Sequence, residues 1–321
     1  MPLPVVLLVG PTASGKSAAV MTLAQEFDAE IVSIDSALVY RDMNIGTAKP
    51  GAEEQALVPH HLIDLISPME SYSVARFVSD CRAAIDAIHA RGRMPLLIGG
   101  TMMYANLLVN GMSEVPPSDP AIRAELTAQR ERDGIASLHA ELAAVDPVTA
   151  QRLPPTDTQR IERALEVWRI TGTPLSSLQG HRVPALAGVD HLMLRWLPTD
   201  RAWLHDRCEQ RLTDMFASGF VAEVEALRAK YPLHADLPSM RCVGYRQVLD
   251  VLECRGPKAE LFDRALFATR QLAKRQITWL RGFDGETVGT VQCDAANALT
   301  HARELIQQAI DGTRAPARAS A

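Results

Sequence analysis

The sequence predicts an α/β protein with a P-loop NTPase-like parallel sheet core and a mainly helical insertion domain. Two observations support this fold class. Continuous apolar stretches that suit buried strands alternate with helical patterns over the first hundred residues, which is typical of a parallel sheet. The first of these stretches also runs directly into the motif GPTASGKS, which has the spacing of a phosphate-binding loop.

The N-terminal elements follow from their apolar patterns. Residues 5–9 form an uninterrupted apolar stretch that ends at Gly10-Pro11, which predicts a strand buried on both faces. Helical spacing follows over 17–27, and a second short strand is expected at 31–34. Helical spacing returns over 74–90, and residues 95–98 predict a third buried strand that stops at Gly99-Gly100.

The pattern changes after Gly111, where a proline-rich stretch at 116–120 interrupts the chain. Helices are expected at about 120–145 and 157–171, the second with Thr156 or Asp157 as its N-cap. Residues 191–197 predict a strand that returns to the sheet, and 200–282 is expected to be mostly helical. The tail beyond Pro316 contains only Ala, Arg and Ser and is predicted to be disordered.

These patterns divide the chain into three parts. Residues 1–111 and 181–283 are predicted to form the catalytic core, 112–180 the helical insertion, and 284–321 a partly disordered C-terminal extension. The five cysteines show no metal-ligand spacing, so we expect reduced thiols and no structural zinc. The apolar start of the chain is too short to span a membrane and lacks a basic leader, which predicts a cytoplasmic protein.

The phosphate-binding loop predicts a site for a diphosphate or triphosphate. Glycines let backbone N–H groups turn toward phosphate oxygens, and the helix that follows adds its N-terminal dipole. In this motif Lys16 would place a positive charge on the phosphates, and the Ser17 hydroxyl would hold Mg²⁺. The expected diphosphate-binding residues are Gly10, Pro11, Thr12, Ala13, Ser14, Gly15, Lys16 and Ser17.

A single carboxylate follows the early strands at the edge where ligands bind. An NTPase usually has a strand that ends in a magnesium-binding Asp, whereas here the strand at 95–98 ends in Gly-Gly-Thr101. Asp35, after the second strand, therefore fits a general base beside the phosphates. The alternative for Asp35 or Ser36 is a cap on the next helix.

Five segments of the chain closely resemble bacterial tRNA dimethylallyltransferases (tRNA isopentenyltransferases). The first is DSALVYRDMNIGTAKP at 35–50, shortly after the phosphate loop. The others are GGTMMY at 99–104, DTQRIERALE at 157–166, SMRCVGYRQ at 239–247 and ATRQLAKRQITWLR at 268–281. Together with the first strand and the phosphate loop, they span residues 5 to about 283 in the family's order. The departures, at 42, 44 and 102–105, fall on no residue assigned to chemistry.

The resemblance implies an SN2-like prenyl transfer. Dimethylallyl diphosphate would bind with its diphosphate in the phosphate loop, and N6 of adenosine 37, beside the anticodon of tRNAs that read codons beginning with U, would attack its allyl carbon. Asp35 would take the amine proton, Thr101 would lie near both substrates, and Lys16 would stabilise the leaving diphosphate. Arg211 would also reach the diphosphate, although Arg207, one helical turn away, could serve instead.

The resemblance also assigns residues to tRNA, the expected macromolecular partner through its anticodon stem-loop. They are Asp35, Ser36, Ala37, Leu38, Thr101, Arg123, Gln159, Arg160, Ile161, Glu162, Arg163, Met240, Arg241, Cys242, Val243, Gly244, Tyr245, Lys274 and Arg275. The target adenine must leave its stack to react. No membrane contact or obligate protein partner is expected, and a monomer is the default.

The charge distribution is compatible with RNA binding even though the net charge of the chain is −5. Residues 181–282 carry a net charge of +4, and 264–281 hold five basic residues and no acid. Such a helix provides a surface for phosphates. Without the resemblance, it would be equally plausible that these basic residues form an ordinary solvent-exposed helix face that binds nothing. Trp203 and Trp279 are expected to be core or packing residues rather than base-stacking platforms.

Two rival functions are compatible with a phosphate loop. The first is a P-loop kinase for a small molecule or nucleotide, in which Asp35 would deprotonate a hydroxyl group. The second is an RNA-binding regulator with a relict nucleotide site. Prenyl transfer to an anticodon stem-loop, and its dependence on Asp35, would separate both from the prenyl transferase.

Overall fold

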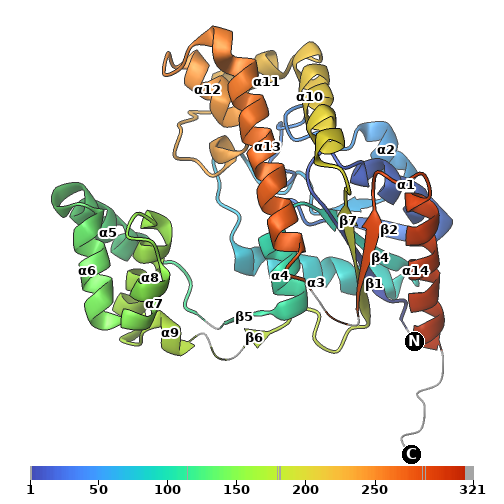
Figure 1. The fold of residues 1–321 in the computed structure, drawn as a ribbon, viewed down its shortest axis with the longest axis horizontal. Coiled ribbons are helices and arrows are strands. Elements are labelled where there is room, and N and C mark those ends of the chain that lie inside the picture. Colours follow the sequence, from blue (N-terminus) through green and yellow to red (C-terminus); the bar gives the residue numbers. More distant parts are fainter. Residues whose placement is uncertain are drawn as a thin grey trace, which may run out of the picture. The chain divides into compact units, whose positions relative to one another are not determined.

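The computed structural model of this protein describes residues 2–113, 115–178, 180, 182–283, 285 and 287–314. The chain divides into two compact units, Met1–Leu108 with Gly188–Ala321 and Val109–Ala187. The smaller unit contains the predicted insertion and extends beyond it at both ends. Figure 1 labels the elements of both units, which are described separately.

The larger unit is built on a parallel sheet, as predicted. Among the described residues six strands pair in the order β3-β2-β4-β1-β7-β8, and every pairing is parallel. The strands are β1 (Val5–Val9), β2 (Ala29–Ser33), β3 (His60–His61), β4 (Met94–Gly99), β7 (His191–Leu197) and β8 (Val288–Gln292). The predicted strands at 5–9, 31–34, 95–98 and 191–197 are thus confirmed, within two residues at their ends.

Helices cover both faces of this sheet, which explains why its central strands are apolar throughout. Every residue of β1 is buried. On one face, α1 (Lys16–Glu26) and α14 (Ala298–Arg314) pack on alternate residues of the strands. Figure 1 shows α3 (Val74–Ala90) and α4 (Met102–Asn110) on the other side, where α3 contacts β2 and β4.

The helices after β7 form the remainder of the larger unit. They are α10 (Arg201–Ala217), α11 (Phe220–Lys230), α12 (Tyr245–Leu252) and α13 (Leu261–Leu280), with short 3₁₀ turns at Ser239–Arg241 and Lys258–Glu260. Helix α2 (Ala52–Leu57) lies in the loop region between β2 and β3. The α13 helix packs against α10 through a cluster that includes Leu204, Leu212 and Ala273. The predicted helical character of 200–282 is confirmed.

The C-terminal residues belong to the core of the larger unit, which corrects the expectation of an extension at 284–321. Strand β8 pairs with β7, from Met193 opposite Val288 to Leu197 opposite Gln292. Ala302 and Ile306 of α14 are fully buried in the cluster that covers β1. The sequence signal is weak because β8 is a five-residue segment that contains Gly289. The predicted disorder of the tail falls outside the described residues.

The smaller unit is helical and has its own apolar cluster. Its helices are α5 (Pro120–Asp133), α6 (Ile135–Val145), α7 (Pro147–Arg152), α8 (Thr158–Thr171) and α9 (Leu175–Leu178). Two short strands, β5 (Met112–Ser113) and β6 (Arg182–Val183), pair with each other. Leu126, Leu138 and Leu165 form the buried cluster. Of the two predicted caps for α8, Asp157 is the N-cap, and its side chain accepts from the Arg160 N–H.

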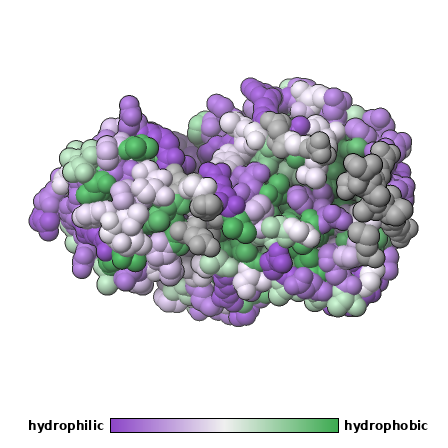
Figure 2. Space-filling model, turned by 90° about the horizontal axis from the view of Figure 1, so that it is seen from below, coloured by the Kyte–Doolittle hydropathy of each residue, from purple (hydrophilic) through white to green (hydrophobic). Residues whose placement is uncertain are grey.

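The surface is mixed in character. The face in Figure 2 shows small groups of hydrophobic residues separated by hydrophilic ones. No described helix combines the length and the apolar character needed to cross a membrane.

Candidate active site

The phosphate loop connects β1 to α1 as the sequence predicts. Gly15 is the N-cap of α1 and has a φ of 84°, a left-handed conformation that favours glycine. Because a helix leaves its first N–H groups without partners in the helix, those of α1 point out of its N-terminus toward the centre of the loop. The loop therefore presents backbone donors and the positive end of a helix dipole, which together suit an anion.

Side chains from distant elements hold the outer side of this loop. Trp196 donates its indole N–H to the Ser14 carbonyl at 2.9 Å, and Arg207 Nε donates to the Ala13 carbonyl at 2.8 Å. Gln276 of α13 accepts from the Thr12 N–H and donates to the Gly100 carbonyl, both at 2.8 Å. The loop geometry is thus fixed by β7, α10 and α13 before any ligand binds.

Two cations lie close together near the loop. Lys16 Nζ donates to the Pro11 carbonyl at 2.5 Å. Burial, and then the charge of Arg211, lower the Lys16 pKa to about 7, while Asp35 acts in the opposite direction. Burial likewise lowers the pKa of Arg211. Two desolvated cations so close together favour a bound anion, because its charge would offset both their mutual repulsion and the cost of their desolvation.

The two candidate arginines of α10 occupy different places. Arg207 braces the phosphate loop from outside through Ala13, and its guanidinium lies over the Trp203 ring at 4.9 Å. Arg211 lines the cavity described below and makes a long hydrogen bond, 3.5 Å, to the Thr47 carbonyl. The geometry therefore favours Arg211 over Arg207 as the residue that faces a ligand.

Asp35 and Thr101 follow the neighbouring strands β2 and β4 at the carboxyl edge of the sheet. Asp35 Oδ1 accepts from the Ala37 N–H at 2.9 Å, and Oδ2 makes no hydrogen bond to any residue that the structure describes. Thr101 Oγ1 accepts from the Ser36 N–H at 2.9 Å and lies 3.2 Å from the Ser36 hydroxyl. The segment after Asp35 is a turn rather than a helix, so Asp35 caps no helix.

A cavity of about 720 Å³ joins these groups in the larger unit. Its lining includes cations from four segments, Lys16, Arg211, Arg241 and Arg275, and the carboxylates of Asp35 and Glu54. Of the residues singled out by sequence, those that line it are Thr12, Lys16, Ser17, Asp35, Ser36, Ala37, Leu38, Thr101, Arg211, Arg241, Cys242, Val243, Gly244 and Arg275. Segments more than two hundred residues apart thus form one site.

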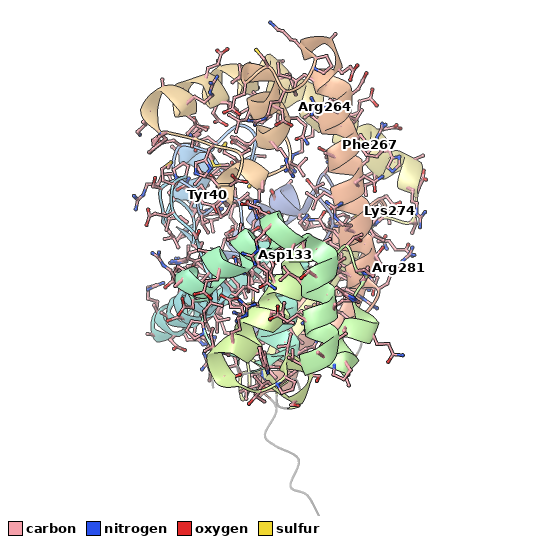
Figure 3. The ribbon with its side chains drawn as sticks, turned by 90° about the vertical axis from the view of Figure 1, so that its left-hand side faces the viewer. Tyr40, Asp133, Arg264, Phe267, Lys274 and Arg281 are labelled. Atoms are coloured by element: carbon pink, nitrogen blue, oxygen red, sulfur yellow. The ribbon has the colours of Figure 1, made fainter. Side chains whose placement is uncertain are left out.

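Three of the tRNA-binding candidates in the larger unit do not line the cavity, and neither do five residues of the phosphate loop, Gly10, Pro11, Ala13, Ser14 and Gly15. Met240 and Tyr245 are fully buried behind it, and Lys274 is exposed on α13. Figure 3 shows Phe267, Lys274 and Arg281 following one another along α13, as their seven-residue spacing on a helix requires. This helix therefore has a cavity side, which includes Arg275, and an exposed basic side, which includes Lys274.

The charged candidates in the smaller unit form ion pairs on α5 and α8. Glu166, with a fully buried side chain, accepts from the Ser118 hydroxyl and pairs with Arg163 at 2.6 Å and Arg123 at 3.4 Å. The remaining candidates are placed as follows: Arg160 pairs with Asp157, Glu162 pairs with Arg130, Gln159 is exposed, and Ile161 is buried in the helical cluster. Arg123 and Arg160 remain at least half exposed.

Sequence reasoning missed two residues of this site and misjudged a third. Gln276 lies in the segment at 268–281 but was assigned no role there, and Glu223, whose contacts are described below, lies in none of the five segments. The expectation of a core position for Trp279 is wrong: the residue is 47% exposed and lines the cavity. Trp203 does pack against the apolar cluster of α10 and α13.

The protein oxygens near the phosphate loop suit a divalent cation that takes most of its ligands from the substrate phosphates. No group of three or more His, Cys, Asp or Glu side chains gathers as a metal site among the described residues. The Ser17 hydroxyl is exposed in the cavity beside the phosphate loop. Mg²⁺ is commonly held by one or two protein oxygens together with substrate phosphates and water, which this arrangement allows.

Comparison with known proteins gives consistent matches. A family model described as IPP transferase matches residues 38–283, and one described as isopentenyl transferase matches residues 3–61. The chain is 54% identical to the tRNA dimethylallyltransferase of Methylibium petroleiphilum, over 97% of this chain and 95% of the relative. It is 51% identical to that of Ralstonia pickettii, over 95% of each chain.

Solved structures agree with these matches. The tRNA isopentenylpyrophosphate transferase of Bacillus halodurans is 33% identical, with a TM-score of 0.68 over 96% of this chain and 97% of its own. A eukaryotic dimethylallyltransferase, captured acting on tRNA, is 25% identical, with a TM-score of 0.80 over 99% of this chain and 81% of its own.

Proposed function

The chain belongs to the tRNA dimethylallyltransferase family, and we propose that its cavity transfers a dimethylallyl group from dimethylallyl diphosphate to N6 of adenosine 37 in tRNA. The observation that carries this proposal is the arrangement of the cavity. Backbone donors and two cations lie close together, and a carboxylate with an available oxygen lies in the same cavity. The family assignment does not favour the P-loop kinase considered as a rival.

The diphosphate would occupy the phosphate loop. Backbone N–H groups at the start of α1, Lys16 and Arg211 would share the negative charge that develops as the C–O bond of the donor breaks. Ser17 would hold Mg²⁺, which, when bound, would neutralise part of the diphosphate charge. The lowered Lys16 pKa supports this placement, because a bound anion would restore the charged form of the amine.

Asp35 would act as the general base. The amine N6 of the adenine would attack the allyl carbon, so that an N–C bond forms while the C–O bond to diphosphate breaks. Asp35 Oδ2, free of protein hydrogen bonds among the described residues, would take the amine proton. Thr101, fixed by its bonds to Ser36, would place a hydroxyl group beside the reacting atoms.

The tRNA would be bound by basic groups on both sides of α13 and at the cavity mouth. Arg241 and Arg275 line the cavity, and Lys274 and Arg281 lie on the exposed side of α13. Neither Lys274 nor Arg275 forms a salt bridge with a residue that the structure describes, so their charges are available to phosphates. The other candidates of the segments 35–38, 159–163 and 240–245, together with Arg123, are further proposed contacts with tRNA.

The protein is also proposed to be a monomer and to be located in the cytoplasm.

A prenyl-transfer assay tests the proposal. Purified protein, radiolabelled dimethylallyl diphosphate, Mg²⁺ and an anticodon stem-loop RNA with adenosine at position 37 should give labelled RNA and free diphosphate. Guanosine at position 37 should abolish labelling. Consumption of ATP without transfer of the prenyl label would instead favour a kinase.

A further inference from the structure

The loop at 44–48 forms one wall of the cavity, and a carboxylate behind that wall holds it. Gly46, Thr47 and Ala48 line the cavity, whereas Glu223 of α11 does not. The inference drawn from this loop rests on the proposed function, because it concerns how the same cavity binds the diphosphate of the prenyl donor.

Glu223 binds three consecutive backbone N–H groups of this loop. Its Oε2 accepts from Asn44 at 2.9 Å and from Ile45 at 2.7 Å, and its Oε1 accepts from Gly46 at 3.2 Å. Successive N–H groups that converge on one point form a concave anion site, and here the anion is the protein's own carboxylate. Hydrogen bonds to a charged acceptor are about twice as strong as neutral ones.

The same carboxylate also joins the loop to α12. The Tyr245 hydroxyl donates to Glu223 Oε1 at 2.5 Å, and burial together with that carboxylate raises the Tyr245 pKa. The Phe220 and Tyr245 rings meet edge to face at 5.0 Å. A Cβ atom on Gly46 would lie 2.1 Å from the Phe220 ring, so only glycine allows the loop this close to the rings.

The held loop in turn contacts Arg211. The Ala48 N–H donates to the Ile45 carbonyl at 3.0 Å, which closes a tight turn with Gly46 and Thr47 at its centre. The Thr47 carbonyl, in that turn, accepts from Arg211 Nη2 at 3.5 Å. Because Glu223 binds the three N–H groups that begin the turn, it determines where this carbonyl points.

We propose that Glu223 is a positioning residue for diphosphate binding, acting through the 44–48 loop and the Thr47 carbonyl to orient Arg211 toward the phosphate loop. It touches neither substrate. A tyrosine and three backbone groups need a single acceptor with two oxygens, which a carboxylate provides and an amide does not. With Gln at this position, the amide nitrogen would face a donor, so the turn should loosen without collapse.

Binding of inorganic pyrophosphate with Mg²⁺, measured by titration calorimetry, tests this role. We expect Glu223→Ala to weaken binding about tenfold and Glu223→Gln about threefold, with a rise in the KM for the prenyl donor and an unchanged KM for the RNA. The matched control is Asp42→Asn. Asp42 joins the same loop region to Lys230 and Tyr231 but lies outside the cavity lining, so pyrophosphate affinity should stay unchanged.

A double-mutant cycle separates action through Arg211 from general loss of structure. In an Arg211→Ala background, Glu223→Ala should change pyrophosphate affinity less than twofold. Equal effects in both backgrounds, an equal loss in Asp42→Asn, or parallel rises in both KM values would overturn the proposal. Wild-type protein that binds no pyrophosphate would contradict the proposed function itself, whereas normal wild-type binding with unaffected Glu223 variants would contradict only this inference.

Discussion

At the scale of single residues, the site depends on where two charged groups are held. Asp35 has one oxygen bound to the Ala37 N–H and one without a protein partner in the described structure. Lys16 is held against the Pro11 carbonyl in a partly buried position. Each of these two residues lies shortly after a strand of the sheet, and its position leads to a direct test.

Replacing Asp35 by Asn should remove most of the prenyl transfer and leave tRNA affinity largely intact. The amide keeps the bond to Ala37 but cannot take a proton, so we expect kcat to fall about 10²- to 10⁴-fold. Single-turnover assays and filter binding measure the two effects. If transfer persists at the wild-type rate, Asp35 is not the general base.

The lowered Lys16 pKa predicts a pH dependence of diphosphate binding. Above about pH 7 the free site holds Lys16 mainly neutral, and a bound anion raises the pKa of the amine. Binding of pyrophosphate at pH 8 should therefore take up a proton, and affinity should fall as the pH rises above 7. Calorimetry in buffers of different ionisation enthalpy measures the uptake. The Lys16→Met variant reports the protons exchanged by pyrophosphate alone and should show a smaller uptake.

At the scale of elements, α13 connects the phosphate loop to the proposed RNA surface. Its buried Gln276 bonds to the Thr12 N–H and to the Gly100 carbonyl, while other residues of the helix reach the cavity or the exposed side. One helix can serve both purposes because its residues point in different directions around its axis.

Gln276→Leu should destabilise the protein. The change leaves one backbone donor and one acceptor without their partner, which costs about 1–3 kcal/mol in the free energy of unfolding. Gln271→Leu, at a half-buried position of the same helix, is the control and should cost about 0.5 kcal/mol or less. Denaturant unfolding compares the two, and equal values would mean that Gln276 does not anchor the loop.

The exposed basic side of α13 should contribute to the salt dependence of tRNA binding. Each lost phosphate contact reduces the slope of log K against log salt concentration by about 1, so Lys274→Ala should lower it by that amount. Lys258→Ala, which removes an exposed lysine near the start of the helix, should leave the slope unchanged. A slope unaffected by Lys274→Ala would remove this side of the helix from the interface.

At the scale of the whole molecule, the C-terminal segment completes the sheet. Because β8 pairs with β7 and α14 covers β1, residues 288–314 are part of the core that holds the site. We expect Ile306→Ala to destabilise the protein by about 2–5 kcal/mol, since the side chain is fully buried. Gln307→Ala on the exposed side of α14 should have little effect. Thermal unfolding of both variants decides whether α14 is integral to the fold.

Elements with local signals could be predicted from the sequence alone. The strand at 5–9, the phosphate loop, the helix at 74–90 and a helix cap at Thr156 or Asp157 follow from residues that are neighbours in the chain. The resemblance to a family rested on the same kind of signal, since long motifs are contiguous. These predictions needed no knowledge of the tertiary structure.

Contacts between groups that are distant in the chain could not be predicted in this way, because they depend on the fold. Gln276 reaches the phosphate loop, and Glu223 reaches the loop at 44–48, across more than 170 residues of chain. The pairing of β8 with β7, the exposure of Trp279 and the place of Arg211 in the cavity lining also depend on the fold. The physical reason is that hydrogen bonding, burial and desolvation depend on neighbours in space, which the fold alone brings together.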